Sequence, residues 1–147
     1  MKDLILLAIR LYFGVSLLCF AEQGGIAKFN WGVSNISTNL VAPLGFPFDM
    51  FPLGFSYLVV AAELCGPILI ITGIMAQLGA FLLSCHMAVA TYAHLVVWQS
   101  GFWSTLENKS NVHGSLIYLM FALCIFVVGP GKFTLGIIFG GKKQKSN

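Results

Sequence analysis

The hydrophobic positions of the chain form four long runs, separated by polar segments and by segments rich in glycine and proline. The runs cover about residues 4–21, 54–75, 78–98 and 114–128. A helix of about 20 apolar residues spans the roughly 30 Å hydrocarbon core of a bilayer. The pattern therefore predicts an all-α membrane protein, in which residues 1–147 form a single domain built as a four-transmembrane-helix bundle.

The composition agrees with this prediction. Hydrophobic residues make up 58% of the 147 residues and charged residues only 9%, and the mean hydropathy is +0.88. Soluble domains carry nearer to 25% charged residues, and a small soluble domain must leave much of its surface in water. These values exclude a water-soluble fold. The net charge of +3 is spread along the chain, which does not indicate a nucleic-acid partner, so the expected partner is the lipid bilayer.

The first run is expected to be a retained helix rather than a cleaved signal peptide. Arg10 interrupts its apolar stretch, and no A-x-A cleavage site precedes Glu22. The four cysteines are expected to be small buried hydrophobes, because no two of them form a CxxC pair and each falls in a different apolar run: Cys19, Cys65, Cys85 and Cys124.

The connection over residues 22–53 contains several glycines and prolines, so it is too broken for a spanning helix. Its aromatic residues predict a loop that lies at the headgroup level or caps the bundle. Four helices put both termini on one side, and Lys2 together with the basic tail over residues 140–147 assigns that side to the cytoplasm. The loops 22–53 and 99–113 then face outward.

One carboxylate, Glu63, lies near the middle of the second run. An acid at this depth is costly unless it is paired or hydrated, which makes Glu63 a functional-site candidate. A rise of about 1.5 Å per residue brings Arg10 and His86 to a similar depth. Two interpretations stay open. An Arg10–Glu63 pair could cancel charge while His86 packs between helices, or the three groups could accept protons or bind a ligand.

A second set of polar side chains is expected at the outer surface. His94 ends the third run and His113 begins the fourth, while Glu22 and Lys28 lie in the loop over residues 22–53. The two histidines and a carboxylate could form a metal site, but HxxxH, HExxH and CxxC spacings are absent from the sequence. No metal is predicted, and solvation at the membrane interface accounts for these residues.

Several short motifs, taken in order, give the chain a resemblance to the DoxX family of membrane proteins. The resemblance covers nearly the whole chain and rests on residues 10–14 (RLYFG), 25–29 (GIAKF), 45–47 (GFP), 63–66 (ELCG), 69–73 (LIITG), 90–94 (ATYAH), 101–102 (GF), 116–119 (LIYL) and 129–132 (GPGK). The chain departs from the family pattern where His113 stands at the start of the fourth run, after the second run at residues 75–77, and at residues 134–136.

The resemblance implies a four-helix bundle in the bacterial cytoplasmic (inner) membrane and a link to redox systems. One branch of the family is similar to the small membrane subunit of thiosulfate:quinone oxidoreductase, and others are tied to oxidative or thiol stress. On this reading the chain is a membrane subunit of a quinone-linked redox or oxidative-stress system with a soluble redox partner. Quinone is the one ligand implied, and the side chains expected to bind or protonate it are Glu63, Arg10, His86 and His94, with Tyr12, Tyr92 and Trp98 lining the pocket.

Two other functions remain open at this point. The chain could be a non-catalytic scaffold that anchors a soluble partner through its outer loops or basic tail. It could also transport a small solute or lipid, although four helices are few for a carrier unless the protein forms a homo-oligomer.

Overall fold

A computed structural model describes residues 2–20, 25–99 and 112–134, and every regular element within these ranges is helical. The long segments follow the four predicted runs closely. They are α1 (Lys2–Val15) with its π-helical continuation η1 (Ser16–Phe20), α4 (Pro52–Thr72), α5 (Ala76–Tyr92) with its π-helical continuation η5 (Ala93–Val97), and α6 (Val112–Val128). The basic tail and most of the loop 99–113 lie outside the described residues.

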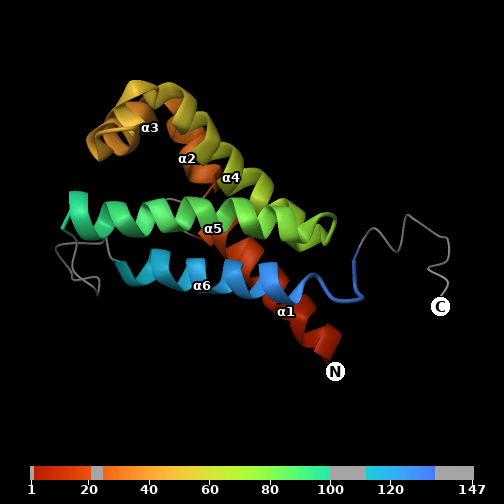
Figure 1. Cartoon of the computed structure of the whole chain (residues 1–147). Helices are drawn as coiled ribbons and strands as arrows, with labels where there is room; N and C mark the ends of the chain where they lie inside the picture. Colours follow the sequence, from red (N-terminus) through yellow and green to blue (C-terminus); the bar gives the residue numbers. More distant parts are fainter. Residues whose placement is uncertain (1, 21–24, 100–111, 135–147) are drawn as a thin grey trace.

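The long helices run in alternating directions (Figure 1). Helix α5 packs between α4 and α6, and α1 crosses against α4. The start of α1, the turn between α4 and α5, and the end of α6 all lie on one side of the molecule. The apolar core is shared by these helices and contains Phe13, Leu17, Ile70, Ala80, Leu83, Met87, Ala122 and Ile125.

The predicted loop between the first two runs is in fact largely helical, so that part of the prediction was wrong. It contains α2 (Gly25–Trp31), α3 (Val33–Ile36), η2 (Ser37–Val41), η3 (Ala42–Leu44) and η4 (Phe48–Met50). Glycine and proline stop a long helix but allow short ones between them. This folded-back segment, residues 25–50, packs on α4 through a second apolar cluster centred on Ile36, Val41 and Val60.

Small residues allow the helices to approach closely. A β-carbon on Gly79 would lie 2.7 Å from the carbonyl oxygen of Gly66, and one on Gly66 would lie 2.7 Å from Leu83 Cγ. Helices α4 and α5 therefore meet at a pair of glycines, as is common in lipid. On the other side of α4, a β-carbon on Gly14 would overlap the Ile71 side chain.

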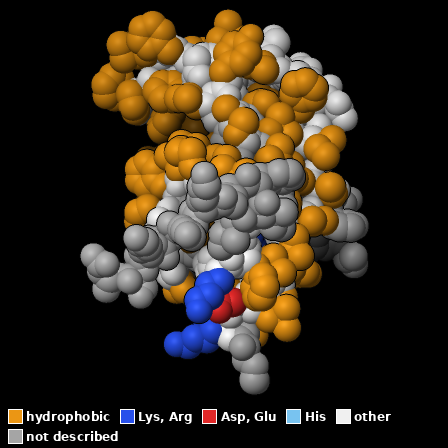
Figure 2. Space-filling view, turned by 90° about the vertical axis from the view of Figure 1, so that its right-hand side faces the viewer, with side chains coloured by type: hydrophobic (Ala, Val, Ile, Leu, Met, Phe, Trp, Pro, Cys, Tyr) orange, Lys and Arg blue, Asp and Glu red, His pale blue; other side chains and the backbone are white. Residues whose placement is uncertain are grey.

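Within the described ranges, Pro52–Thr72 and Ala76–Val97 are the helices long and apolar enough to cross a membrane, with 21 and 22 residues, and Val112–Val128 is a shorter apolar helix. Large apolar side chains also cover much of the outer surface, including Val127 at 77% exposure. Figure 2 shows this surface, with most of the charged side chains in view gathered near the bottom of the molecule. The four cysteines are exposed on this surface rather than buried as predicted.

Candidate functional site

Glu63 lies on the inner face of α4 and is only 2% exposed. Pro67, four residues later, has no N–H group to donate to the Glu63 carbonyl, so the helix ladder leaves that oxygen without its usual partner. Gly25, the first residue of α2, packs directly on this carbonyl, and a β-carbon on Gly25 would overlap it. The contact brings the folded-back segment against α4 at the level of Glu63.

Two basic side chains converge on one oxygen of the Glu63 carboxylate. The Lys28 ammonium group, one helical turn after Gly25, donates to Oε1. The His86 ring, on α5, places its Nε2 atom 2.6 Å from the same oxygen. The second oxygen, Oε2, is buried and receives no hydrogen bond from the described residues. Three segments, α2, α4 and α5, therefore meet at this carboxylate.

The contacts are those expected around an ionised carboxylate. Lys28 supplies a positive charge, which offsets the cost of burying an ionised carboxylate in an apolar surrounding. An ionised carboxylate only accepts hydrogen bonds, so His86 donates from Nε2. Nδ1 is then the nitrogen through which the ring can exchange a proton with another molecule. The buried Oε2 atom can still accept a hydrogen bond. Leaving a buried acceptor without a donor costs about 1–3 kcal/mol of folding free energy, so a ligand that donates to Oε2 would recover this cost.

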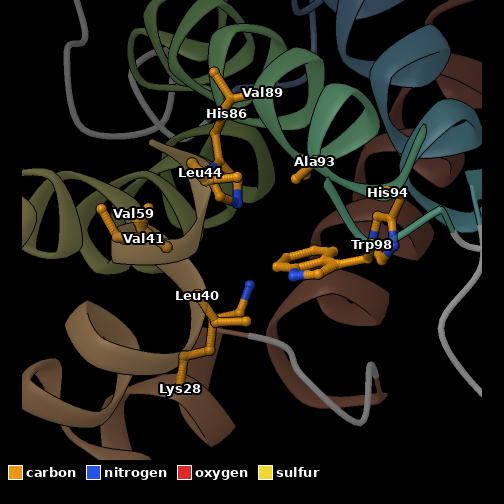
Figure 3. Close-up of a pocket in the computed structure, with 11 residues that line it drawn as sticks. Lys28, Leu40, Val41, Leu44, Val59, His86, Val89, Ala93, His94 and Trp98 are labelled. Atoms are coloured by element: carbon orange, nitrogen blue, oxygen red, sulfur yellow. The ribbon is translucent and has the colours of Figure 1, made fainter. Parts of the chain in front are cut away.

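Two cavities meet at His86. The smaller, about 80 Å³, lies between α2, η2, α4 and the end of the third run, and is lined by Lys28, His86, His94 and Trp98 together with apolar side chains. In Figure 3 the Lys28 and His86 side chains point into this space, and the Trp98 indole closes one side of it. The larger cavity, about 460 Å³, is lined by apolar residues of α4, α5 and the folded-back segment. His86 is the polar side chain common to both.

The family model for DoxX matches residues 5–96, which include Lys28, Glu63 and His86. The chain belongs to the DoxX family. No curated protein and no solved structure matches it significantly. This DoxX chain is therefore a membrane protein in contact with the lipid bilayer, and its charge cluster lies within the region that defines the family.

The Arg10–Glu63 pair, one of the two interpretations that the sequence left open, does not form. Its guanidinium group is buried and donates instead to backbone carbonyls at two places. Nε donates to Ile70 at 3.0 Å, and Nη2 to Ile71 at 3.3 Å, at the C-terminal end of α4. Nη1 and Nη2 also reach Pro130 and Phe133 after α6. The last carbonyls of a helix lack partners within the helix, so Arg10 caps α4 and ties it to the segment after α6.

Lys28 was assigned to the outer surface, whereas the DoxX structure makes it the cationic partner of Glu63. Depth along the sequence could not reveal this, because α2 folds back along α4. Two signals were present in the sequence. Pro67 four residues after Glu63 exposes a carbonyl, and Gly25 three residues before Lys28 permits close approach.

The remaining candidates divide between the cavity and the surface. His94 lines the smaller cavity and stacks edge-on against Trp98, with ring centroids 5.0 Å apart. His113 lies in the first turn of α6, partly buried, and does not line either cavity. Tyr12 and Tyr92 are at least half exposed and do not line either cavity. Glu22 lies outside the described residues, among which no group of three or more His, Cys, Asp or Glu side chains could hold a metal ion.

Proposed function

We propose that this DoxX protein is the membrane subunit of a quinone-linked redox or oxidative-stress system in the bacterial cytoplasmic membrane. The observation that carries the proposal is the buried Lys28–Glu63–His86 cluster beside a cavity that continues into an apolar groove. A quinone combines a polar ring with an apolar tail, and this site combines the two matching environments. Ionisable groups inside a membrane bundle commonly mark ligand sites or proton relays.

In the proposed topology the chain crosses the membrane four times, with α1 as the first span, α6 as the last span, and both termini in the cytoplasm. The alternating helix directions and the shared side of the α1 start and the α6 end support this arrangement (Figure 1). The folded-back segment, which carries Lys28, then lies toward the outer half of the bundle, where it covers Glu63.

The contacts support the following chemistry in this proposal. Reduction of a quinone to a quinol consumes two electrons and two protons. In this proposal a soluble redox partner supplies both electrons, His86 delivers one proton from Nδ1 to a quinone oxygen, and the second proton reaches the other quinone oxygen from water. The Glu63 carboxylate stabilises the imidazolium form that makes this donation and keeps Nε2 protonated throughout. Lys28 balances the carboxylate when the ring is neutral. These three residues bind and protonate the ligand.

A binding titration tests the proposal. Purified wild-type protein in lipid nanodiscs should bind a long-tailed benzoquinone saturably. Glu63→Gln should weaken binding about tenfold, because the charge that orients His86 is removed and a charge-assisted hydrogen bond is worth about 1.5–3 kcal/mol. Asp49→Asn is the matched control, since Asp49 is exposed and lines neither cavity, and it should bind like wild type. Quinone binding that is absent, or equal in both variants, contradicts the proposal.

A further inference from the structure

The larger cavity is an apolar groove that reaches the outer surface of the bundle. It is lined by Val41, Leu44, Phe48, Phe55, Leu58, Val59, Ala61, Ala62, Leu82, Cys85, His86 and Val89. Several of these residues are exposed, among them Leu58 at 64% and Leu82 at 38%, and the Cys85 thiol is exposed as well. In a membrane protein this exposure faces hydrocarbon rather than water. The groove is therefore open to the bilayer along α4 and α5.

The groove and the smaller cavity are parts of one site. They share Val41, Leu44, Val59, Val89 and His86. At about 80 Å³ the smaller cavity is roughly half the size of an engineered cavity of about 150 Å³ that holds one benzene. It can admit the oxygen of a ring but not the whole ring. A ring that reaches Lys28 and His86 must therefore remain beside His86, with its substituents in the groove.

The volume of the groove suits a long apolar substituent. At about 460 Å³ it lies within the range of about 300–1,000 Å³ typical of ligand pockets. Apart from the Cys85 thiol, His86 is its one ionisable side chain, so an occupant finds a strongly polar contact only at the His86 end. An occupant with a polar end at His86 and hydrocarbon along the rest matches this distribution.

We infer that the groove holds the prenyl tail of the quinone, and that the ligand enters sideways from the bilayer between the folded-back segment and helices α4 and α5. The inference rests on the proposed function and adds the tail site and the route of entry. It follows that the tail contributes to recognition, so that tailless quinones bind more weakly than tailed ones. It also follows that a bound tail covers Cys85.

Cys85 and Cys65 provide a matched pair of reporters. Both thiols are exposed on the helix surface, but Cys85 lines the groove and Cys65 does not. Two full-length variants are needed, each with the other three cysteines replaced by serine. Each is reacted in nanodiscs with a membrane-permeant maleimide, with and without saturating quinone. The quinones are fully substituted on the ring, so that they do not add thiols, and one carries a decyl tail while the other has none.

The tailed quinone should slow labelling of Cys85 about tenfold, since pockets of this kind bury about 70–90% of a bound ligand. Labelling of Cys65 should stay within error of the rate without quinone, and the tailless quinone should leave both rates unchanged. A separate variant, Ala61→Phe, adds bulk to an exposed position in the groove. It should weaken binding of the tailed quinone and leave binding of the tailless one unchanged.

Three results would overturn the inference. If the tailed quinone binds in a Glu63-dependent way but Cys85 reacts at its full rate, the tail lies elsewhere and the proposed function stands. If a decyl chain without a quinone ring protects Cys85 equally well, the groove is an ordinary contact for lipid chains. If neither quinone binds, the proposed function fails, and the inference fails with it.

Discussion

The backbone carbonyl of Glu63 lies against Gly25 so closely that no β-carbon fits between the two residues. This contact fixes the start of α2 on the middle of α4. Lys28 is one helical turn further along α2, and its ammonium group consequently reaches the Glu63 carboxylate. A backbone contact thus decides which cation neutralises the buried acid.

Gly25→Ala should separate α2 from α4, because the new methyl group would overlap a backbone atom that cannot move aside. We expect a lower thermal stability, by about 1–3 kcal/mol as for other overpacked sites, together with weaker quinone binding. Gly54→Ala is the control, since a β-carbon there meets no atom closer than 3.9 Å. Melting curves in the same detergent compare the two. A wild-type melting temperature for Gly25→Ala would contradict the contact.

Removing the charge of Lys28 should be damaging only while Glu63 stays ionised. Breaking one partner of a buried ion pair costs about 3–5 kcal/mol, so Lys28→Met should lower the melting temperature by about 10 °C or more. In the double variant Lys28→Met/Glu63→Gln no buried charge is left unpaired, and most of the lost stability should return. Equal stability of the single and double variants would contradict the unpaired Glu63 charge as the cause of the loss.

The sequence was sufficient to locate the four long helices, because each apolar run is bounded by glycine, proline or polar residues that end a helix. It also singled out Glu63 as the acid near the middle of a run and placed both His86 and Arg10 at a similar depth, without deciding between them. Depth along a helix is one coordinate, however, and it does not say which way a side chain faces. Arg10 has a suitable depth but reaches the C-terminal end of α4 instead.

The part that sequence reasoning missed depends on the path of residues 25–50. Their glycines and prolines exclude a spanning helix, and from the sequence alone this pattern predicts an outer loop. The same residues form short helices that return along α4 and bury Ile36 and Val41 against Val60. Tertiary packing of this kind is not visible in local patterns, so Lys28 could not be assigned to Glu63 before the fold was known.

Arg10 should matter for stability rather than for ligand binding. Its four hydrogen bonds join the end of α4 to residues 130–133, and none involves the cavity. Arg10→Lys cannot reproduce the forked geometry of a guanidinium group, so we expect a loss on the order of 2 kcal/mol. Quinone affinity measured well below the melting temperature should be unchanged. A large loss of affinity in a folded Arg10→Lys protein would return Arg10 to the binding site.

The proposed topology can be tested with reporter fusions in a bacterial host. A fluorescent protein fused after residue 147 should fluoresce, because the C-terminus is assigned to the cytoplasm. Alkaline phosphatase inserted between residues 105 and 106 should be active, because that loop faces outward in the proposal. A dark C-terminal fusion together with an inactive inserted phosphatase would show the inverted topology. If each reporter is also placed at the other site, activity of both at the same site would argue against a fixed orientation.

In the proposed site His86, held by Glu63, hydrogen-bonds a quinone oxygen. Infrared spectra of a quinone carrying ¹³C at one carbonyl, bound to the protein in nanodiscs, detect this hydrogen bond. We expect one of the two carbonyl bands to lie at lower frequency than in nanodiscs without protein. In His86→Phe this shift should disappear, while in Asp49→Asn it should remain. Carbonyl bands that match those of the free quinone, or a shift that survives His86→Phe, would contradict the account.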